Sequence, residues 1–138
     1  MDLRKITDDF TVSPQIEATD IPAIVAAGFR SVLCNRPDGE EPDQCCFDDV
    51  SQAAKDAGLE VRSVPISSGY VRPEDLEAFK DALDQMPRPV LAYCRSGTRC
   101  TMLWTLAQYG QIAPEEILNL TGKAGYDMSG IVQQLSQR

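Results

Sequence analysis

A cysteine and two arginines share one short polar loop near the middle of the second half of the chain. The segment from Pro89 to Gly110 reads PVLAYCRSGTRCTMLWTLAQYG. Residues 90–93 are typical of a buried strand, and apolar residues recur at helical spacing from Met102 onward. A loop between a strand and a helix N-terminus can direct its N–H groups and the positive end of the helix dipole at one anion. We therefore predict that Cys94, the first loop residue, is a thiolate nucleophile.

The other loop residues are expected to bind an anion beside this thiolate. Guanidinium groups offer forked donors to anions, so Arg99 is expected to orient the loop or an anionic substrate, and Arg95 to attract one. For Arg99, a salt bridge to a neighbouring carboxylate is the structural alternative. Ser96 and Thr98 suit side-chain to backbone bonds that fix the loop shape. Gly97 suits a positive φ or a close backbone approach.

Cys100 has two possible roles at the start of the following helix. It either packs there as a small side chain, or it resolves an oxidised Cys94 as a disulfide or receives a sulfur atom from it. Cys45 and Cys46 could act similarly if the fold brings them close. The five cysteines are an odd number without C-x-x-C spacing, which indicates reduced thiols. The chain has no histidine, so we expect no Cys-His dyad, no metal site and no cofactor.

Length and charge limit the remaining possibilities. The 138 residues are expected to form a single domain over 1–138, large enough for a proper core. A formal net charge of −8 argues against nucleic acid or an anionic membrane as partner, because both require a cationic face. The first residues lack the apolar core of a signal peptide and no run reaches membrane-spanning length, so we expect a cytoplasmic protein.

The elements that must position the loop alternate between strand and helix. Strands are expected at 11–13 (an edge strand), 29–34, 59–66 and 90–93, and helices at 22–28, 43–57, from 73, after the cysteine loop, at 114–120 and at 127–135. This alternation predicts an α/β domain with a mainly parallel sheet and helices on both faces.

Ligands of such sheets bind beyond the carboxyl ends of the strands, which brings together the loops 35–40, 67–72 and 94–99. In the first of these, Arg36 and Asp38 are expected to support the site. Alternatively, Asp38 only forms a turn with the next glycine, and Arg36 only pairs with Glu40 or Glu41.

The order of motifs resembles that of known families. From Leu59 onward, a V-P-I strand, a D-L-x-x-F helix and the strand that precedes the cysteine loop resemble the dual-specificity and tyrosine phosphatase superfamily. More closely, GFRSVLCNRPDGEE together with YCRSGTRC-x-x-LW resembles the bacterial phosphatase-like family named for the N-terminal domain of beta-lactamase hydrolase-like proteins. This resemblance covers nearly the whole chain. It implies a cysteine-phosphatase-like fold, and it implies a persulfide dioxygenase as a possible partner, since some members are fused to such a domain.

Two departures from the phosphatase pattern decide the expected activity. Phosphatase loops carry arginine six positions after the cysteine, whereas here Arg99 comes one residue early and Cys100 takes that position. The general-acid aspartate of the superfamily corresponds to Ser68, and losing a proton donor typically lowers the rate by ~10²–10⁴-fold. The loop C-R-S-G-x-R resembles that of rhodanese sulfurtransferases, and sulfur transfer between thiols needs no such acid.

We therefore expect a thiol sulfurtransferase of sulfide and persulfide metabolism that passes sulfane sulfur through a Cys94 persulfide. Glutathione persulfide or thiosulfate is the expected small anionic donor, and a thiol is the acceptor. The first alternative is a tyrosine or dual-specificity type phosphatase that forms a Cys94 phosphocysteine, with Asp38 as a displaced general acid. The second alternative is a non-catalytic module that binds anions or senses redox state.

Overall fold

Five strands form one sheet in the computed structural model, which describes residues 1–67 and 70–137. The strand order is β1-β2-β5-β3-β4, in which β1 is antiparallel to β2 and the other neighbours are parallel. The strands are β1 (Arg4–Thr7), β2 (Phe10–Ser13), β3 (Ser31–Cys34), β4 (Glu60–Ser63) and β5 (Val90–Tyr93). The predicted mainly parallel sheet is confirmed.

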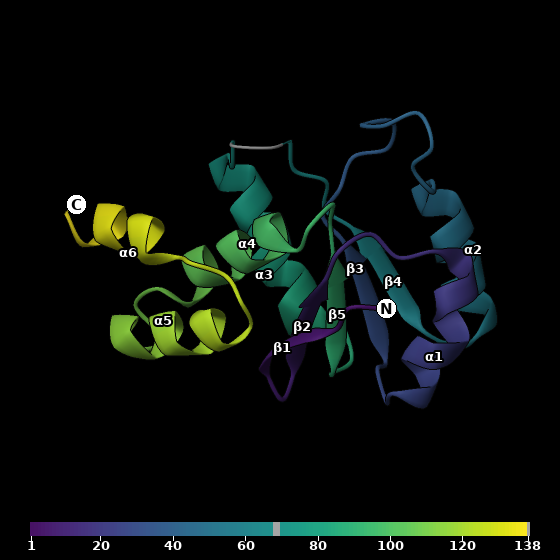
Figure 1. The fold of residues 1–138 in the computed structure, drawn as a ribbon, viewed down its shortest axis with the longest axis horizontal. Helices are drawn as coiled ribbons and strands as arrows, with labels where there is room; N and C mark the ends of the chain where they lie inside the picture. Colours follow the sequence, from purple (N-terminus) through teal and green to yellow (C-terminus); the bar gives the residue numbers. More distant parts are fainter. Residues whose placement is uncertain (68–69, 138) are drawn as a thin grey trace.

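Helices cover both faces of this sheet, as the alternation of elements predicted. Figure 1 shows α1 and α2 on one side and α3 to α6 on the other. The first side holds η1 (Ala18–Asp20), α1 (Ile21–Ala26) and α2 (Phe47–Asp56). The second side holds α3 (Pro73–Gln85), α4 (Thr98–Gln108), α5 (Pro114–Lys123) and α6 (Ser129–Ser136). α5 and α6 both contact α4, so the C-terminal helices support the helix that follows the cysteine loop.

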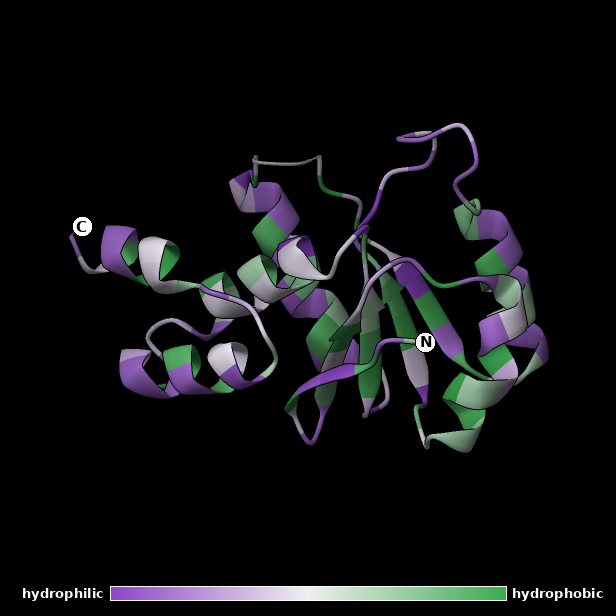
Figure 2. Cartoon of the chain, in the orientation of Figure 1, coloured by the Kyte–Doolittle hydropathy of each residue, from purple (hydrophilic) through white to green (hydrophobic). Residues whose placement is uncertain are grey.

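Strand β5 shows how the sequence divides the core into two halves. Successive strand residues point to opposite faces of a sheet. Leu91 and Tyr93 pack in the cluster beside α1 and α2, whereas Val90 and Ala92 pack in the cluster beside α3 and α4. Cys94 continues the second series and therefore faces α4. Figure 2 shows the central strands as predominantly hydrophobic and the outer faces of the helices as largely hydrophilic.

Two elements differ from the sequence-based expectations. Residues 11–13 were expected at a sheet edge, but β2 lies between β1 and β5. The sequence of β1, RKIT, is short and charged, so its strand pattern is weak, yet it pairs with β2 and covers that edge. The helix expected from residue 43 begins at Phe47, which leaves residues 35–46 as a long connector after β3.

The carboxyl ends of the parallel strands lie side by side. Cys34, the last residue of β3, pairs with Tyr93 of β5 on one side and with Ser63 of β4 on the other. The connectors that follow these strands therefore meet at the carboxyl end of the sheet, as predicted for loops 35–40 and 94–99. In the loop 67–72, residues 68 and 69 lie outside the described residues, so the position matched to the phosphatase acid, Ser68, is not placed.

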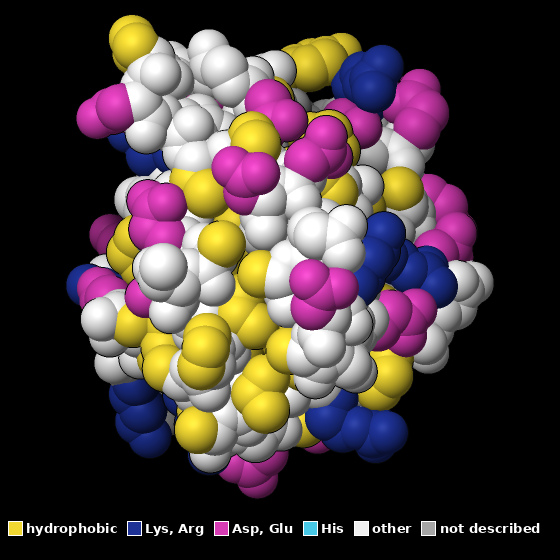
Figure 3. All heavy atoms as spheres, turned by 90° about the vertical axis from the view of Figure 1, so that its right-hand side faces the viewer, with side chains coloured by type: hydrophobic (Ala, Val, Ile, Leu, Met, Phe, Trp, Pro, Cys, Tyr) yellow, Lys and Arg dark blue, Asp and Glu magenta, His cyan; other side chains and the backbone are white. Residues whose placement is uncertain are grey.

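The surface charge agrees with the acidic composition of the chain. Figure 3 shows acidic side chains spread over the face that α1 and α2 present, in keeping with the formal net charge of −8. None of the helices in residues 1–67 and 70–137 is both long enough and apolar enough to cross a membrane.

Candidate active site

Cys94 lies at the point where β5 passes into the loop before α4. Its side chain is fully buried, and the Gly97 N–H donates a hydrogen bond to its Sγ over 3.1 Å. α4 begins at Thr98, so the positive end of its dipole lies next to this sulfur. The strand, the loop and the helix start therefore follow one another as the sequence predicted.

Gly97 allows the loop to turn so tightly. Its φ is 90°, a left-handed conformation that side chains disfavour, and an added Cβ would collide with the Tyr126 hydroxyl. That hydroxyl donates to the Ser96 carbonyl over 2.9 Å. The Ser96 hydroxyl in turn donates to Thr98 Oγ1 over 3.0 Å, so these two side chains bond each other across the turn. Both expectations for Gly97, positive φ and close approach, describe the observed geometry.

The loop stabilises the ionised form of Cys94. A hydrogen bond from the Cys100 thiol and others from loop N–H groups outweigh burial and lower the pKa of Cys94 to about 5. Burial raises the pKa of Cys100 well above its usual value, so this thiol keeps its proton and remains a donor. At neutral pH the pair is therefore a Cys94 thiolate that accepts from a Cys100 thiol.

This geometry predicts the pH dependence of Cys94 alkylation. Only the thiolate reacts, so the rate with iodoacetamide is expected to rise through pH 5 and to be constant near neutral pH. Burial raises the pKa of Cys45 to about 11, so Cys45, distinguished from the adjacent Cys46 by fragmentation of their common peptide, is an internal control whose rate should rise only in alkali. Mass spectrometry of quenched digests measures both rates. A Cys94 midpoint near the ordinary thiol value of about 8.5 would contradict the assigned contacts.

Arg99 binds a carboxylate beside the loop. Its Nη1 donates to Glu40 Oε2 and its Nη2 to Glu40 Oε1, each over 2.8 Å. Nη1 also donates to the carbonyl of Ile66 over 2.8 Å, and the side chain is only 9% exposed. Hydrogen bonding to Glu40 raises the pKa of Arg99, and the nearby charge of Cys94 adds to this effect. The salt bridge that was the structural alternative for Arg99 is thus present.

The contact between Glu40 and Arg99 was not predicted from the sequence. Its Oε1 accepts a second hydrogen bond, from Arg36 Nε over 2.8 Å. The bonds from Arg99, followed by those from Arg36, lower the pKa of Glu40 to about 2. Glu40 is therefore ionised at neutral pH and has no proton to donate. The sequence showed its four-residue spacing from Arg36, but it gave no sign of the contact with Arg99, 59 positions away.

Arg36 and Arg95 extend this network to the loop. Arg36 is 4% exposed, and its Nη1 donates to Gln15 Oε1 over 3.0 Å. The Gln15 backbone N–H donates to the carbonyl of Arg95 over 3.3 Å. The Arg95 side chain is 69% exposed and pairs with Glu41 over 2.8 Å, so it lies at the rim. Arg36 thus supports the site, and it also makes the pairings with Glu40 and Glu41 that were its alternative role.

Asp38 makes a contact that stabilises the start of a helix. Its Oδ1 accepts a hydrogen bond from the backbone N–H of Phe47, the first residue of α2, over 2.9 Å. This contact satisfies one of the unpaired N–H groups of the helix start.

We therefore expect substitutions of Asp38 to act on stability. Asp38→Ala should lower the free energy of unfolding by about 1 kcal/mol, whereas Asp38→Asn should preserve it because asparagine also caps helices well. Urea denaturation measures both values. A general-acid role would instead appear as a ~10²-fold or larger loss of phosphoester turnover in Asp38→Asn at unchanged stability.

Cys45 and Cys46 lie apart from this network, whereas the Cys34 thiol donates to the carbonyl of Arg36 over 3.3 Å. Cys45 is close enough to Glu17 for a hydrogen bond, and Cys46 is the N-cap residue of α2. All five cysteines are free thiols. Within the described part of the chain, no group of three or more histidine, cysteine or acidic side chains could hold a metal ion.

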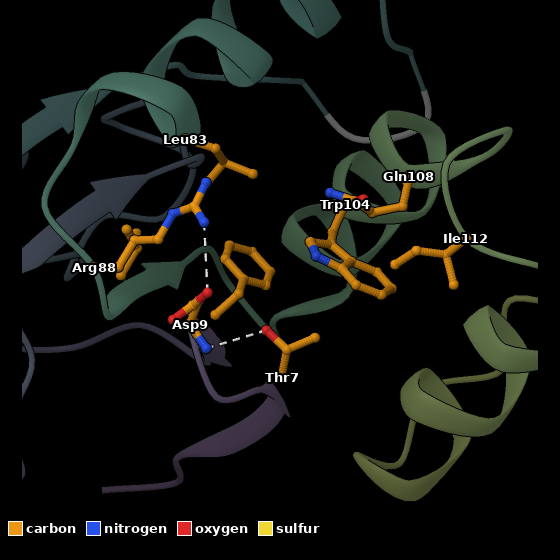
Figure 4. A pocket seen from close by; sticks show the side chains of 9 residues that line it. Thr7, Asp9, Leu83, Arg88, Trp104, Gln108 and Ile112 are labelled. Atoms are coloured by element: carbon orange, nitrogen blue, oxygen red, sulfur yellow. Dashed lines mark hydrogen bonds and ion pairs between the residues drawn. The ribbon is translucent and has the colours of Figure 1, made fainter.

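A separate cavity of about 310 Å³ lies where β2 and β5 begin, at the end of the sheet opposite Cys94. Figure 4 shows Trp104 and Gln108 of α4 on one side of it and the Asp9–Arg88 ion pair, 3.5 Å long, on the other. No residue of the loop 94–99 lines it. This cavity is therefore separate from the candidate site at Cys94.

Comparison with known proteins relates this geometry to a family. The chain is 30% identical to the beta-lactamase hydrolase-like protein of Agrobacterium fabrum over 136 residues, which are 97% of this chain and 32% of that protein. It thus spans about a third of the length of that curated relative. A crystal structure of a candidate phosphatase from Neisseria meningitidis has 31% identity and a TM-score of 0.87, covering 99% of this chain and 98% of the other.

A more distant structure shares the fold. The TpbA protein of Pseudomonas aeruginosa, crystallised with phosphotyrosine, has a TM-score of 0.64 at 15% identity, with 92% of this chain and 76% of that chain covered. The cysteine-phosphatase-like scaffold expected from the order of motifs is confirmed.

The expected sulfurtransferase activity is wrong. The family model that residues 2–111 match is described as a phosphatase-like domain, and the similar structure from Neisseria meningitidis is that of a candidate phosphatase. The prediction relied on the short spacing between Cys94 and Arg99 and on the serine at the position of the phosphatase acid. In the fold the Arg99 guanidinium is held by Glu40 and Ile66, and the charge of Cys94 raises its pKa. The expected sulfur donor, thiol acceptor and dioxygenase partner stay untested predictions.

The strongest assignment comes from a family model. Residues 2–111 match the one described as beta-lactamase hydrolase-like protein, phosphatase-like domain. This range includes the whole sheet, the connector with Glu40 and the loop with Cys94. The chain therefore belongs to the family of phosphatase-like domains of beta-lactamase hydrolase-like proteins.

Proposed function

We propose that the chain is a cysteine-dependent phosphatase that hydrolyses phosphoesters through a phosphocysteine on Cys94. The observation that carries this proposal is the buried Cys94 thiolate beneath loop N–H groups, with the Arg99 guanidinium beside it. Preorganised donors of this kind stabilise the charge on a transferring phosphoryl group. The phosphatase-like family supports the same chemistry.

The reaction has two balanced steps. In the first, the Cys94 sulfur attacks phosphorus, an S–P bond forms, and the ester oxygen leaves with the bonding electron pair. In the second, water attacks phosphorus, the S–P bond breaks, and inorganic phosphate and the thiolate are released. Splitting one displacement into two with a good leaving group is the usual advantage of a covalent intermediate.

The proposed substrates are aryl phosphates. Glu40, the carboxylate bound to Arg99, is ionised and has no proton to donate, and Asp38 Oδ1 accepts a hydrogen bond from the first residue of α2. An alkoxide leaves poorly without a proton, whereas a phenolate is a far weaker base and leaves more easily. Phosphotyrosine-like esters are therefore expected to react faster than alkyl esters.

The test is trapping of the intermediate. The full chain is mixed with p-nitrophenyl phosphate, quenched in acid and digested, and the peptide that contains Cys94 is analysed by mass spectrometry. We expect saturable release of p-nitrophenol together with the mass increase of one phosphoryl group on Cys94. Saturable hydrolysis without that modification, or no hydrolysis, would contradict the proposal.

A further inference from the structure

The Arg99 guanidinium has two donors left after its contacts with the described residues are counted. A guanidinium carries five N–H donors in a fixed fork. Both Nη1 donors and one Nη2 donor are used by Glu40 and by the carbonyl of Ile66. The Nε–H and the second Nη2–H have no recorded partner among residues 1–67 and 70–137. These two lie parallel on one edge, which is the arrangement that binds an oxyanion through two hydrogen bonds.

Glu40 is itself fixed by a second arginine, Arg36. Arg36 Nε donates to Glu40 Oε1 over 2.8 Å, and Arg36 Nη1 donates to Gln15 Oε1 over 3.0 Å. The Gln15 N–H then bonds the carbonyl of Arg95 in the catalytic loop over 3.3 Å. The chain of contacts that starts at Arg99 therefore returns to the loop, through side chains of which Arg36 is 4% exposed. Such an arrangement restricts where the Glu40 carboxylate can lie.

The position of Arg99 in the chain explains why an external support is needed. Arg99 is the second residue of α4, so its backbone belongs to the first helical turn and not to the loop that surrounds the thiolate. Of the described contacts of its side chain, none is to the loop 94–98; they are to the β3–α2 connector and to Ile66, which follows β4. The direction of the guanidinium is thus set by segments outside the loop.

We propose that Glu40 is a positioning residue for catalysis. It binds the far end of the Arg99 guanidinium and thereby directs the free Nε–Nη2 edge at the oxyanion above Cys94. This inference rests on the proposed phosphatase function for its biological meaning, but the anion-binding edge that it assigns can be measured without turnover.

Glu40 could act in the opposite way, as a competitor of the substrate. A carboxylate bound to a buried arginine neutralises it, so removing Glu40 would strengthen anion binding through charge alone. The two roles predict effects of opposite sign. A positioning residue that is removed weakens anion recognition despite the extra positive charge.

The test compares two alkylating agents of nearly equal size on the full chain. Iodoacetate carries a carboxylate and iodoacetamide does not, and both transfer their carbon to the Cys94 thiolate with release of iodide. The ratio of their rates at the Cys94 peptide, divided by the ratio for free glutathione thiolate, measures the anion-binding edge beside the sulfur. The variants are Glu40→Gln, which removes the charge, and Glu40→Asp, which keeps the charge and shortens the side chain. Glu60→Gln, which removes a carboxylate that pairs with Arg62 on β4, is the charge-matched control.

We expect Glu40→Gln and Glu40→Asp each to lower the rate ratio, and to lower kcat/KM for p-nitrophenyl phosphate roughly 10- to 100-fold. Glu60→Gln should leave both within about twofold of the unsubstituted protein. A higher ratio or a lower KM in Glu40→Gln would overturn the inference and identify Glu40 as a competitor. An unchanged ratio in both Glu40 variants would overturn it as well.

The design separates this inference from the proposed function. If no protein in the series hydrolyses phosphoesters but the two Glu40 variants still lower the alkylation ratio, the positioning role stands and the phosphatase proposal fails. If Glu40→Gln does not fold, as judged by circular dichroism, Glu40→Asp decides alone, because its charge is unchanged and only the reach of the carboxylate differs.

Discussion

Replacing Cys94 with serine is expected to lower the rate of phosphoester hydrolysis on the order of 10⁴-fold or more, as loss of a covalent nucleophile does. The loop lowers the pKa of the Cys94 thiol to about 5, so the attacking group is fully ionised at neutral pH. A serine hydroxyl in the same place starts from a far higher pKa and stays protonated there. Because the two side chains are similar in size, the buried loop should keep its shape. Initial rates with p-nitrophenyl phosphate measure the loss.

Cys46→Ser is the matched control for this substitution. Cys46 is the N-cap residue of α2 and its thiol is only partly buried. Serine is a favoured N-cap residue, so neither the stability nor the rate should fall. If Cys94→Ser retained a tenth of the activity or more, the covalent mechanism would be refuted, and a nucleophile other than Cys94 would have to be sought.

Replacing Arg99 with lysine is expected to lower kcat about 10²- to 10³-fold, the loss typical of removing a preorganised donor to the transition state. Lysine keeps the positive charge, but it is a point charge that cannot offer a parallel pair of N–H groups. It also cannot bind both oxygens of Glu40 while it binds the Ile66 carbonyl and a substrate oxyanion. Steady-state kinetics with p-nitrophenyl phosphate give kcat and KM, and thermal unfolding shows whether the fold is intact.

Whether the substitution changes kcat or KM decides which role Arg99 has. A loss in kcat with little change in KM means that Arg99 acts on the transition state. A rise in KM alone, at unchanged kcat, would contradict that role and leave Arg99 as a binding residue only.

The catalytic loop was predictable from sequence because its signals are local. A short apolar run, a polar loop with Gly97 and a helical pattern after it occupy adjacent positions, and each reports its own backbone conformation. The contact of Glu40 with Arg99 joins residues 59 positions apart, and it arises only when parallel strands align their carboxyl ends. Nothing in the composition of the 35–46 connector indicates which of its carboxylates reaches the loop.

Two predictions from the sequence were wrong, the edge position of β2 and the sulfurtransferase activity, and both concern contacts between distant segments of the chain. The interior place of β2 was missed because the partner that covers it, β1, has too few apolar residues to be recognised as a strand. The sulfurtransferase prediction inferred the chemistry from the spacing of Cys94 and Arg99 and from the missing acid at Ser68. In the folded protein the Arg99 side chain is held by Glu40 and Ile66, which belong to other segments.

A side chain that packs on the catalytic loop lies outside the residues that match the family model. The family model ends at residue 111, yet the hydroxyl that bonds Ser96 and fills the space above Gly97 belongs to Tyr126. Tyr126 is fixed in turn from the other end of the chain, since Arg4 lies over its ring at 5.3 Å and also bonds the carbonyl of Ala124. Ser96 and Gly97 are thus supported from outside the matched residues, by Tyr126 and, through its ring, by Arg4, so a truncation at residue 111 would remove a side chain that packs on the catalytic loop.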